Sequence, residues 1–344
     1  MRIESKGLTY VWVAAALVLP QTVIAQKRYI APGTGGEITR PVLSELWREP
    51  KDIASENMLY GVGGREHEPK GPFTFVKEDL EGTNPKYNVR DENGVKWKVK
   101  LGAEARPETV ASRFVWAVGY HTDEDYFLPE ITISGMPARV HRGQKLISPG
   151  GVMHNVRLKR EGDEKKEDIW RWRDNPFTGT RELDGLRVMM AVVNNWDLKD
   201  ENNAIRNIKR PTDGDKRIYE VSDLGASFGS EGLSRTHEQS KGNLKAYVHS
   251  RFIKKEGPEF VDFNVPRRPA LVVLVNPREF FGRMGLRGIG RHIPRQDAQW
   301  IGQMLGQLSD QQIRDAFRAG GYSGQELDGF TAAFEQRIAE LKKL

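Results

Sequence analysis

The chain contains no cysteine. This absence excludes disulfide bonds, cysteine–zinc sites, a thiol nucleophile and lipid attachment at a cysteine. The fold must therefore be stabilised by its own core. A chain of 344 residues is long enough to form one large domain or two smaller ones around such a core.

Other signatures are absent too. The sequence has neither a Walker-type phosphate loop nor an H-E-x-x-H motif, and its seven histidines are scattered along the chain. The net charge of +6 is small for this length, and there is neither a basic tail nor a stripe of interleaved basic and aromatic residues. We therefore expect no nucleic-acid partner.

The long apolar run of the sequence lies at its N-terminus. Arg2 and Lys6 precede this run, and Val23 and Ala25 occupy the small-residue positions of a signal-peptide cleavage site. The pattern predicts a signal peptide over residues 1–25 and export to the periplasm or the medium. The alternative is an uncleaved anchor, so membrane association is expected only if this segment is retained.

The rest of the sequence predicts an α+β protein with two lobes. Residues 26–57 form a lead-in segment, 58–140 an N-lobe with an antiparallel sheet, and 141–344 a mainly helical C-lobe. Apolar alternation and turn residues predict strands in the N-lobe, whereas Pro and Gly bracket a helix after them. Helices are also expected before residue 194 and from about 243 onward, with Ser309 and Ser323 as N-caps. The elements expected before residue 194 are strands at Pro72–Leu80, Lys86–Asp91 and Val95–Leu101 and helices at Pro107–Gly119 and Thr180–Val193.

Two short motifs carry the residue types that phosphoryl transfer needs. In "DLKDEN", Asp197 can orient or deprotonate an attacking hydroxyl, Lys199 can neutralise the transferring group, and Asn202 can help to hold a metal ion. Asp223 in "SDLG" follows a predicted strand and precedes glycine, which suits a carboxylate that binds Mg²⁺.

The N-lobe supplies complementary groups. The loop "EGTNPK" contains Gly82, Thr83 and Lys86 between two strands, so its backbone amides can cover phosphates. Lys100 on the following strand can bind phosphates if Glu108, in the first turn of the next helix, holds it. Lys98 shares the strand face with Lys100 and is the alternative lysine.

In this order the motifs resemble those of the protein-kinase-like fold. "DLKDEN" is similar to the catalytic-loop pattern H-R-D-L-K-x-x-N, and "DLG" to the D-F-G metal motif. The short spacing from lysine to glutamate resembles the atypical branch of HipA-like and CotH-like kinases, secretory-pathway casein kinases and type II phosphatidylinositol 4-kinases. The sequence departs from the pattern because Asn195-Trp196 replaces His-Arg and no A-P-E segment is present.

The resemblance implies ATP or another nucleotide as cofactor, with Mg²⁺ or Mn²⁺. Asp197 would be the catalytic base and Lys199 a phosphate contact, whereas Asn202 and Asp223 would be metal ligands. Lys100, paired with Glu108, would bind the phosphates. The acceptor, a protein or a small molecule, is open.

Three alternatives are kept. The chain can be a kinase-fold binding module without activity, although the retained Lys100, Asp197 and Asp223 argue for some nucleotide chemistry. It can also be a nucleotidyltransferase on the same fold. Finally, "GASFG" fits the G-x-S-x-G nucleophile elbow with Ser227 as nucleophile, although the polar, Gly-rich sequence after it does not favour the required helix.

Overall fold

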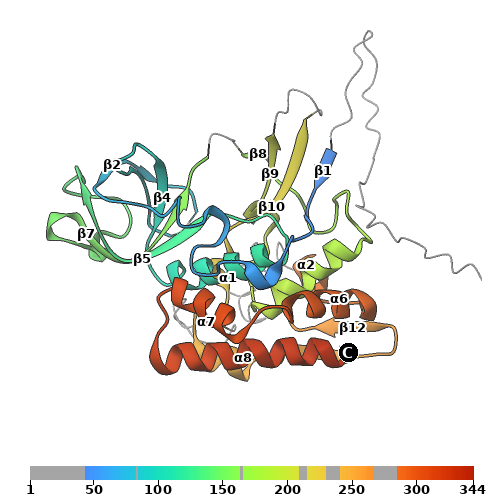
Figure 1. Cartoon of the computed structure of the whole chain (residues 1–344). Coiled ribbons are helices and arrows are strands. Elements are labelled where there is room, and N and C mark those ends of the chain that lie inside the picture. Colours follow the sequence, from blue (N-terminus) through green and yellow to red (C-terminus); the bar gives the residue numbers. More distant parts are fainter. Residues whose placement is uncertain (1–42, 83, 163–165, 209–214, 230–240, 266–284) are drawn as a thin grey trace, which may run out of the picture.

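The structure is a computed structural model that describes residues 43–82, 84–162, 166–208, 215–229, 241–265 and 285–344. The expected signal peptide, the beginning of the lead-in segment and Thr83 lie outside the described residues. The fold is α+β, with a sheet-rich N-terminal lobe above a mainly helical C-terminal lobe (Figure 1).

The N-lobe is built on a six-stranded sheet. Its strands are ordered β4-β3-β2-β5-β7-β6, and a further pairing of β4 with β7 closes the sheet on itself. The buried faces of these strands supply Tyr87, Val89, Trp97, Val99 and Leu158 to a compact apolar core. The sheet continues to Arg160, beyond the boundary expected at residue 140. The strands are β2 (Phe73–Asp79), β3 (Lys86–Arg90), β4 (Lys96–Lys100), β5 (Asp125–Ser134), β6 (Ile147–Ser148) and β7 (Val152–Arg160).

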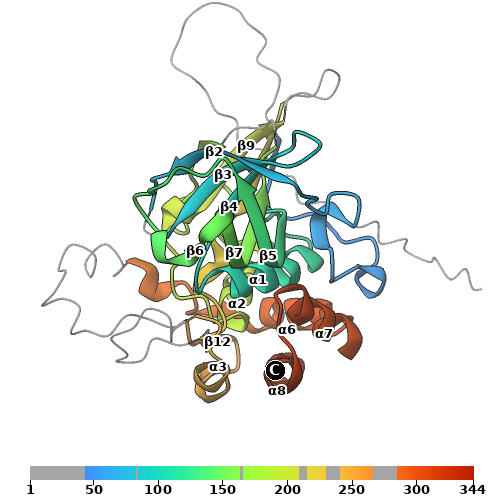
Figure 2. The same ribbon diagram turned by 90° about the vertical axis from the view of Figure 1, so that its left-hand side faces the viewer.

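Helix α1 (Ala105–Ala117) lies between the sheet and the C-terminal helices, as Figures 1 and 2 show. The rings of Phe114 on this helix and Phe334 on the C-terminal helix stack with centroids 3.9 Å apart. Arg113 on the same helix is buried and donates a hydrogen bond of 2.6 Å to the carbonyl of Asp125. α1 is therefore fixed from both lobes.

The helical lobe packs around one large apolar core. Thr180 caps α2 by accepting a hydrogen bond from the amide of Leu183, which matches the helix start expected there. Ser309 forms a full capping box with Gln312 at the start of α7. Ser323 is at the N-cap position of α8, but its side chain makes no capping hydrogen bond. The helices are α2 (Arg181–Val192), α3 (Leu244–His249), α6 (Arg295–Leu305), α7 (Asp310–Ala319) and α8 (Gly324–Lys343).

Two smaller sheets lie outside the N-lobe sheet, and apart from β1 their strands follow the N-lobe in the chain. The first, ordered β1-β10-β9-β8, stands beside the N-lobe, and the second, β11-β12-β13, lies within the region expected to be mostly helical. The strands are β1 (Leu43–Glu45), β8 (Lys166–Asp168), β9 (Asn203–Ile208), β10 (Lys216–Val221), β11 (Ile253–Glu256), β12 (Phe260–Phe263) and β13 (Ile293–Pro294).

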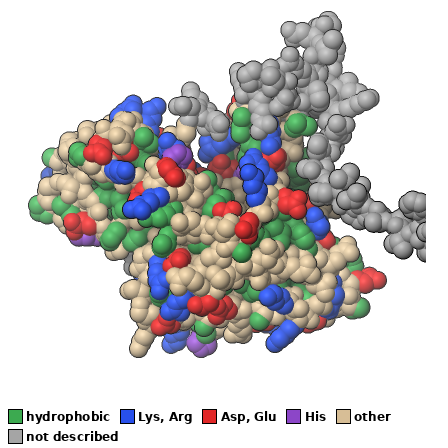
Figure 3. Space-filling model, viewed as in Figure 1, with side chains coloured by type: hydrophobic (Ala, Val, Ile, Leu, Met, Phe, Trp, Pro, Cys, Tyr) green, Lys and Arg blue, Asp and Glu red, His purple; other side chains and the backbone are tan. Residues whose placement is uncertain are grey.

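The visible surface mixes charges of both signs. In Figure 3, Lys and Arg side chains are interspersed with Asp and Glu over both lobes. Within the part of the chain that the structure describes, no helix is long and apolar enough to cross a membrane.

Candidate functional site

The ammonium group of Lys100 is surrounded by three carboxylates. Its Nζ lies 2.7 Å from an oxygen of Glu108, 3.0 Å from Glu104 and 2.6 Å from Asp223. An ammonium has three N–H donors, so these contacts can use all of them. Lys100 is 3% exposed. Lysines on a strand usually point into solvent. Lys100 does not, because its side chain is buried.

Strand register places Lys100 in a band of cations. Lys86 on β3 pairs directly with Lys100, and Arg157 on β7 pairs with it from the other side. Directly paired residues of neighbouring strands point to the same face of a sheet. By the same register Lys98 pairs with Lys159, so all five cations share this face. Such a face suits an anionic ligand if some of its counter-charges can be exchanged.

Glu108 is the most deeply fixed of the three carboxylates. It projects from α1 and is 1% exposed, and its second oxygen lies 2.8 Å from Arg157. Burial raises the pKa of Glu108 to about 7, against the opposing effects of Arg157 and Lys100. The lysine–glutamate pair expected from the sequence is present, and Arg157 is an additional partner that the sequence did not indicate.

Asp223 is held by its neighbours in the chain. Its backbone is left-handed, with φ of 54°, and Ser222 before it hydrogen-bonds Asp123, which in turn lies 2.6 Å from Lys159. Burial alone would raise the pKa of Asp223, but Lys100 outweighs that effect and the net shift is downward. The side chain is 45% exposed, so part of this ionised carboxylate stays accessible.

The segment of Asp197 reaches the same region through a hairpin. Strands β9 and β10 are antiparallel, and Asn203 pairs with Val221 at their open end. The amide of Ser222 donates to the carbonyl of Asn202 at 3.1 Å, so Asn202 lies next to the segment of Asp223. Asn202 also donates 2.6 Å to the carbonyl of Asp197. The hairpin, which the sequence did not predict on its first strand, thus joins the two motifs.

Lys199 lies beside Asp197, with its Nζ 3.6 Å from a carboxylate oxygen, and its side chain is 41% exposed. This pair is at the surface of the site. The 3-10 turn Asp200–Asn202 follows directly, so the stretch is a loop that enters a strand and not the cap of an α-helix.

The predicted phosphate loop is the tight turn between β2 and β3. Gly82 has φ of 65°, and its carbonyl accepts from Arg142. Lys86 Nζ lies 3.9 Å from an oxygen of Asp79, and Lys98 contacts the same carboxylate at 2.9 Å. Lys98 is therefore paired within the N-lobe, whereas Lys100 makes the contact with Glu108 and Asp223.

Glu104 is a site residue that the sequence did not reveal. Besides Lys100, its carboxylate accepts 2.6 Å from Asn84 of the phosphate loop and lies 2.5 Å from Lys241. Burial alone would raise the pKa of Glu104, but Lys100 and Lys241 hold the pKa far below its usual range. The available signal was its spacing of four residues from both Lys100 and Glu108, which carries little weight without a known helix start.

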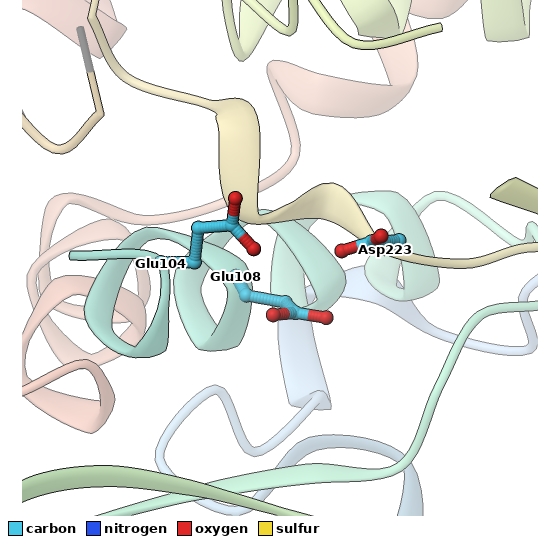
Figure 4. Close-up of side chains that lie close together, drawn as sticks. All are labelled: Glu104, Glu108 and Asp223. Atoms are coloured by element: carbon cyan, nitrogen blue, oxygen red, sulfur yellow. The ribbon is translucent and has the colours of Figure 1, made fainter. Parts of the chain in front are cut away.

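The three carboxylates around Lys100 meet the distance requirement of a metal site. Figure 4 shows Glu104 and Glu108 from the start of α1 opposite Asp223, and their oxygens lie within 4.8 Å of one another. Lys100 already neutralises this space. Asp223, which is partly exposed and beside Asn202, offers the hard oxygen ligands that Mg²⁺ prefers. The donor set therefore fits a metal at the exposed side of Asp223.

The nucleophile-elbow interpretation of Ser227 is wrong. Ser227 is fully buried, whereas an elbow must expose its hydroxyl. Of the residues between Ser227 and α3, the structure describes 228–229 and 241–243, and these are not helical. His249 and His292, two of the suggested bases, make their own contacts elsewhere, with the carbonyl of Lys245 and the ring of Phe260. His237 lies outside the described residues.

The α+β structure has a sheet lobe with a buried lysine, a glutamate on the helix behind it, and a hairpin that joins two acidic loops, which is the arrangement that the resemblance to the protein-kinase-like fold implies. No family model and no curated protein matches the sequence. Among solved structures, the chain is similar to the Helicobacter pylori proinflammatory kinase CtkA, at 10% identity and a TM-score of 0.44 over 80% of this chain and 98% of that one.

It is also similar to the Rio2 kinase of Chaetomium thermophilum, in a structure described as an ADP/Mg²⁺-phosphoaspartate complex. The identity is 11% and the TM-score 0.31, over 77% of this chain and 71% of that one.

Proposed function

We propose that this chain is an exported, kinase-like phosphotransferase that uses a nucleotide with Mg²⁺ or Mn²⁺ and transfers a phosphoryl group to a protein or small-molecule acceptor. The observation that carries the proposal is the position of Lys100. It contacts Glu108 at 2.7 Å on one side and Asp223 at 2.6 Å on the other.

The residues divide the work by their chemistry. Lys100 is oriented by Glu108 and would bind phosphate oxygens with its charge. Asp197 would orient and deprotonate the acceptor hydroxyl, and Lys199 beside it would offset the charge on the transferring group. Asn202 and Asp223 would hold the metal ion, whose role would be to neutralise the phosphate chain.

The nucleotide and metal requirement can be tested by thermal unfolding of the chain with ATP, with and without Mg²⁺. Ligand at about 100 times its Kd should add about 2.7 kcal/mol to the free energy of unfolding. Asp223→Asn should lose the Mg²⁺-dependent part of this gain, whereas the exposed Asp328→Asn in the helical lobe should keep it. The absence of any shift with every nucleotide and metal tried would refute the proposal.

A binding module without transfer is the second candidate, favoured by one observation. Asn195 stands where the catalytic-loop pattern has histidine. It is 1% exposed, and its side-chain oxygen accepts a hydrogen bond of 2.9 Å from the amide of Asp197, so an asparagine and not a histidine holds this loop. Transfer of label from γ-³²P-ATP to the chain or to added acceptors separates the two. The phosphotransferase predicts that Asp197→Asn removes transfer and keeps the nucleotide-dependent shift.

Export is proposed from the N-terminal sequence alone. If residues 1–25 are cleaved, N-terminal sequencing of the chain recovered from outside the cytoplasm should begin at Gln26. A chain that remains in the cytoplasm with Met1 intact would refute this part of the proposal and leave the phosphotransferase standing.

A further inference from the structure

Three donors from separate parts of the chain converge on the carboxylate of Glu104. Asn84 Nδ2 of the phosphate loop lies at 2.6 Å and Lys100 Nζ of β4 at 3.0 Å, both from the same oxygen. Lys241 Nζ, which follows the segment of Asp223, lies 2.5 Å from the other oxygen. Two ammonium groups and an amide around one anion form a charge-assisted binding site.

This site lies between the two halves of the proposed machinery. Lys241 is tied to the Asp223 segment because its neighbours Gly242 and Asn243 donate to the carbonyls of Ser227 and Phe228. Its ammonium also lies 5.6 Å from the ring centroid of Trp196, directly before Asp197. The carboxylate of Glu104 is thus located between Lys100 and the loop that contains Asp197.

Glu104 is fixed by its backbone position less firmly than Glu108. Glu108 lies inside α1 and is also held by Arg157, whereas Glu104 is at the N-cap position and its side chain makes no capping bond. The preceding Gly102 has φ of 93°, and a glycine backbone can change conformation at little steric cost.

We propose that Asn84, Lys100 and Lys241 form a binding site for a phosphate group of the donor, and that Glu104 occupies this site as an internal competitor when no ligand is bound. The inference rests on the proposed function and extends it by naming two phosphate contacts and an autoinhibitory carboxylate. A phosphate that binds here displaces Glu104. The measured affinity for phosphate compounds is therefore the intrinsic affinity multiplied by the fraction of molecules in which Glu104 does not occupy the site.

Two probes test the proposal on the full chain by titration calorimetry. Inorganic triphosphate without metal reports on the anion site, and ATP with Mg²⁺ reports on the proposed function. Glu104→Gln keeps the size of the side chain but removes its charge, so it should bind triphosphate roughly tenfold more tightly than the wild type. Lys241→Ala should bind it roughly tenfold more weakly and Asn84→Ala severalfold more weakly.

The opposite signs separate competition from a structural role, since a variant that merely loosens the fold would bind less in every case. Glu256→Gln is the matched control: it makes the same change of charge at a residue that pairs with Arg295 in the helical lobe, and it should leave triphosphate binding unchanged. Urea unfolding of each variant checks that it is folded.

The inference alone fails if wild type binds Mg-ATP but Glu104→Gln binds triphosphate no more tightly than wild type. It fails in the same way if Glu104→Gln loses Mg-ATP binding, because Glu104 would then be a metal ligand. If neither the wild type nor Glu104→Gln binds either probe, the proposed function is refuted together with it.

Discussion

Replacement of Lys100 by methionine should leave two buried carboxylates with one cation fewer each, because among the described residues only Arg157 then pairs with Glu108 and only Lys241 with Glu104. The side chain keeps its approximate length, but Glu108 and Glu104, which are 1% and 7% exposed, lose their shared cation. Removal of one partner from a buried ion pair costs about 3–5 kcal/mol of stability. Asp223 is 45% exposed, so solvent screens it and it adds little to this loss. Because each carboxylate keeps one cation, we expect Lys100→Met to lower the free energy of unfolding by at most about 3–5 kcal/mol at pH 7.

The loss should depend on pH in a defined direction. Lowered pKa values of Glu104 and Asp223 contribute stability that is present above their ordinary values of 4.5 and 3.8 and is lost as pH falls. Lys100→Met removes this contribution. The difference between wild type and variant should thus shrink as pH falls below about 4.5.

Urea unfolding at pH 7 and at several pH values below about 4.5 measures both effects. The matched control is Lys98→Met on the same strand face, whose lysine is 24% exposed and lies 2.9 Å from Asp79. A partly exposed pair of this kind contributes about 1 kcal/mol or less. Equal losses for the two variants, or a loss for Lys100→Met that does not change with pH, would refute the assignment of Lys100 as the central buried charge.

Three further predictions follow from individual contacts. Burial alone would raise the pKa of Glu45, but His121 and Lys216 lower it to about 2, so Glu45 contributes stability above its ordinary pKa that disappears between about pH 5 and 2. Glu45→Gln should remove up to about 3 kcal/mol at neutral pH and flatten the acid side of the stability curve, as followed by thermal unfolding. A Cβ at Gly225 would meet Cβ of Glu104 at 2.6 Å, so Gly225→Ala should cost roughly 1–3 kcal/mol in urea unfolding through overpacking. Phe114→Ala removes the ring stacked on Phe334 and should cost about 3–5 kcal/mol; a loss below 1 kcal/mol would show that the interface between α1 and α8 is not as tightly packed as described.

The elements with strong local signals could be predicted from the sequence. Alternation predicted β4 at Val95–Leu101, and it is found at Lys96–Lys100. Pro107 and Gly119 bracketed α1, which spans Ala105–Ala117. The apolar stripe before residue 194 became α2. In each case the periodicity of the side chains or a cap residue fixes the element without reference to distant parts of the chain.

Elements that depend on distant partners were missed. Strand β9 (Asn203–Ile208) has polar residues at 203, 206 and 207, so it shows no apolar alternation, and it exists because β10 pairs along its length. The sheet β11-β12-β13 joins Phe260 to Pro294 across a long sequence separation. Pairing energy of this kind is invisible in a local window.

The charged residues of the site also fall into two groups, those that the sequence predicted and those that it did not. The sequence named Lys100, Glu108 and Asp223 because they match a spacing, and the structure brings them together. It did not name Arg157 or Lys241, because strand register places Arg157 there and the backbone hydrogen bonds of the two residues after Lys241 hold Lys241 there. Lysine and arginine are common surface residues, so nothing local distinguishes the buried ones.

Because three carboxylates surround Lys100, the binding of phosphate and the binding of a metal ion should be coupled. A phosphate can reach Lys100 only if one carboxylate gives up its N–H, and Glu108 is fixed by Arg157 at 2.8 Å. Asp223 and Glu104 remain, and under the two proposals a metal ion would attract Asp223 and a phosphate would replace Glu104. A metal that draws Asp223 away from Lys100 therefore frees a donor for phosphate, and phosphate bound at Lys100 in turn favours the metal. Because such coupling is reciprocal in free energy, Mg²⁺ should raise the affinity for triphosphate by the same factor by which triphosphate raises the affinity for Mg²⁺.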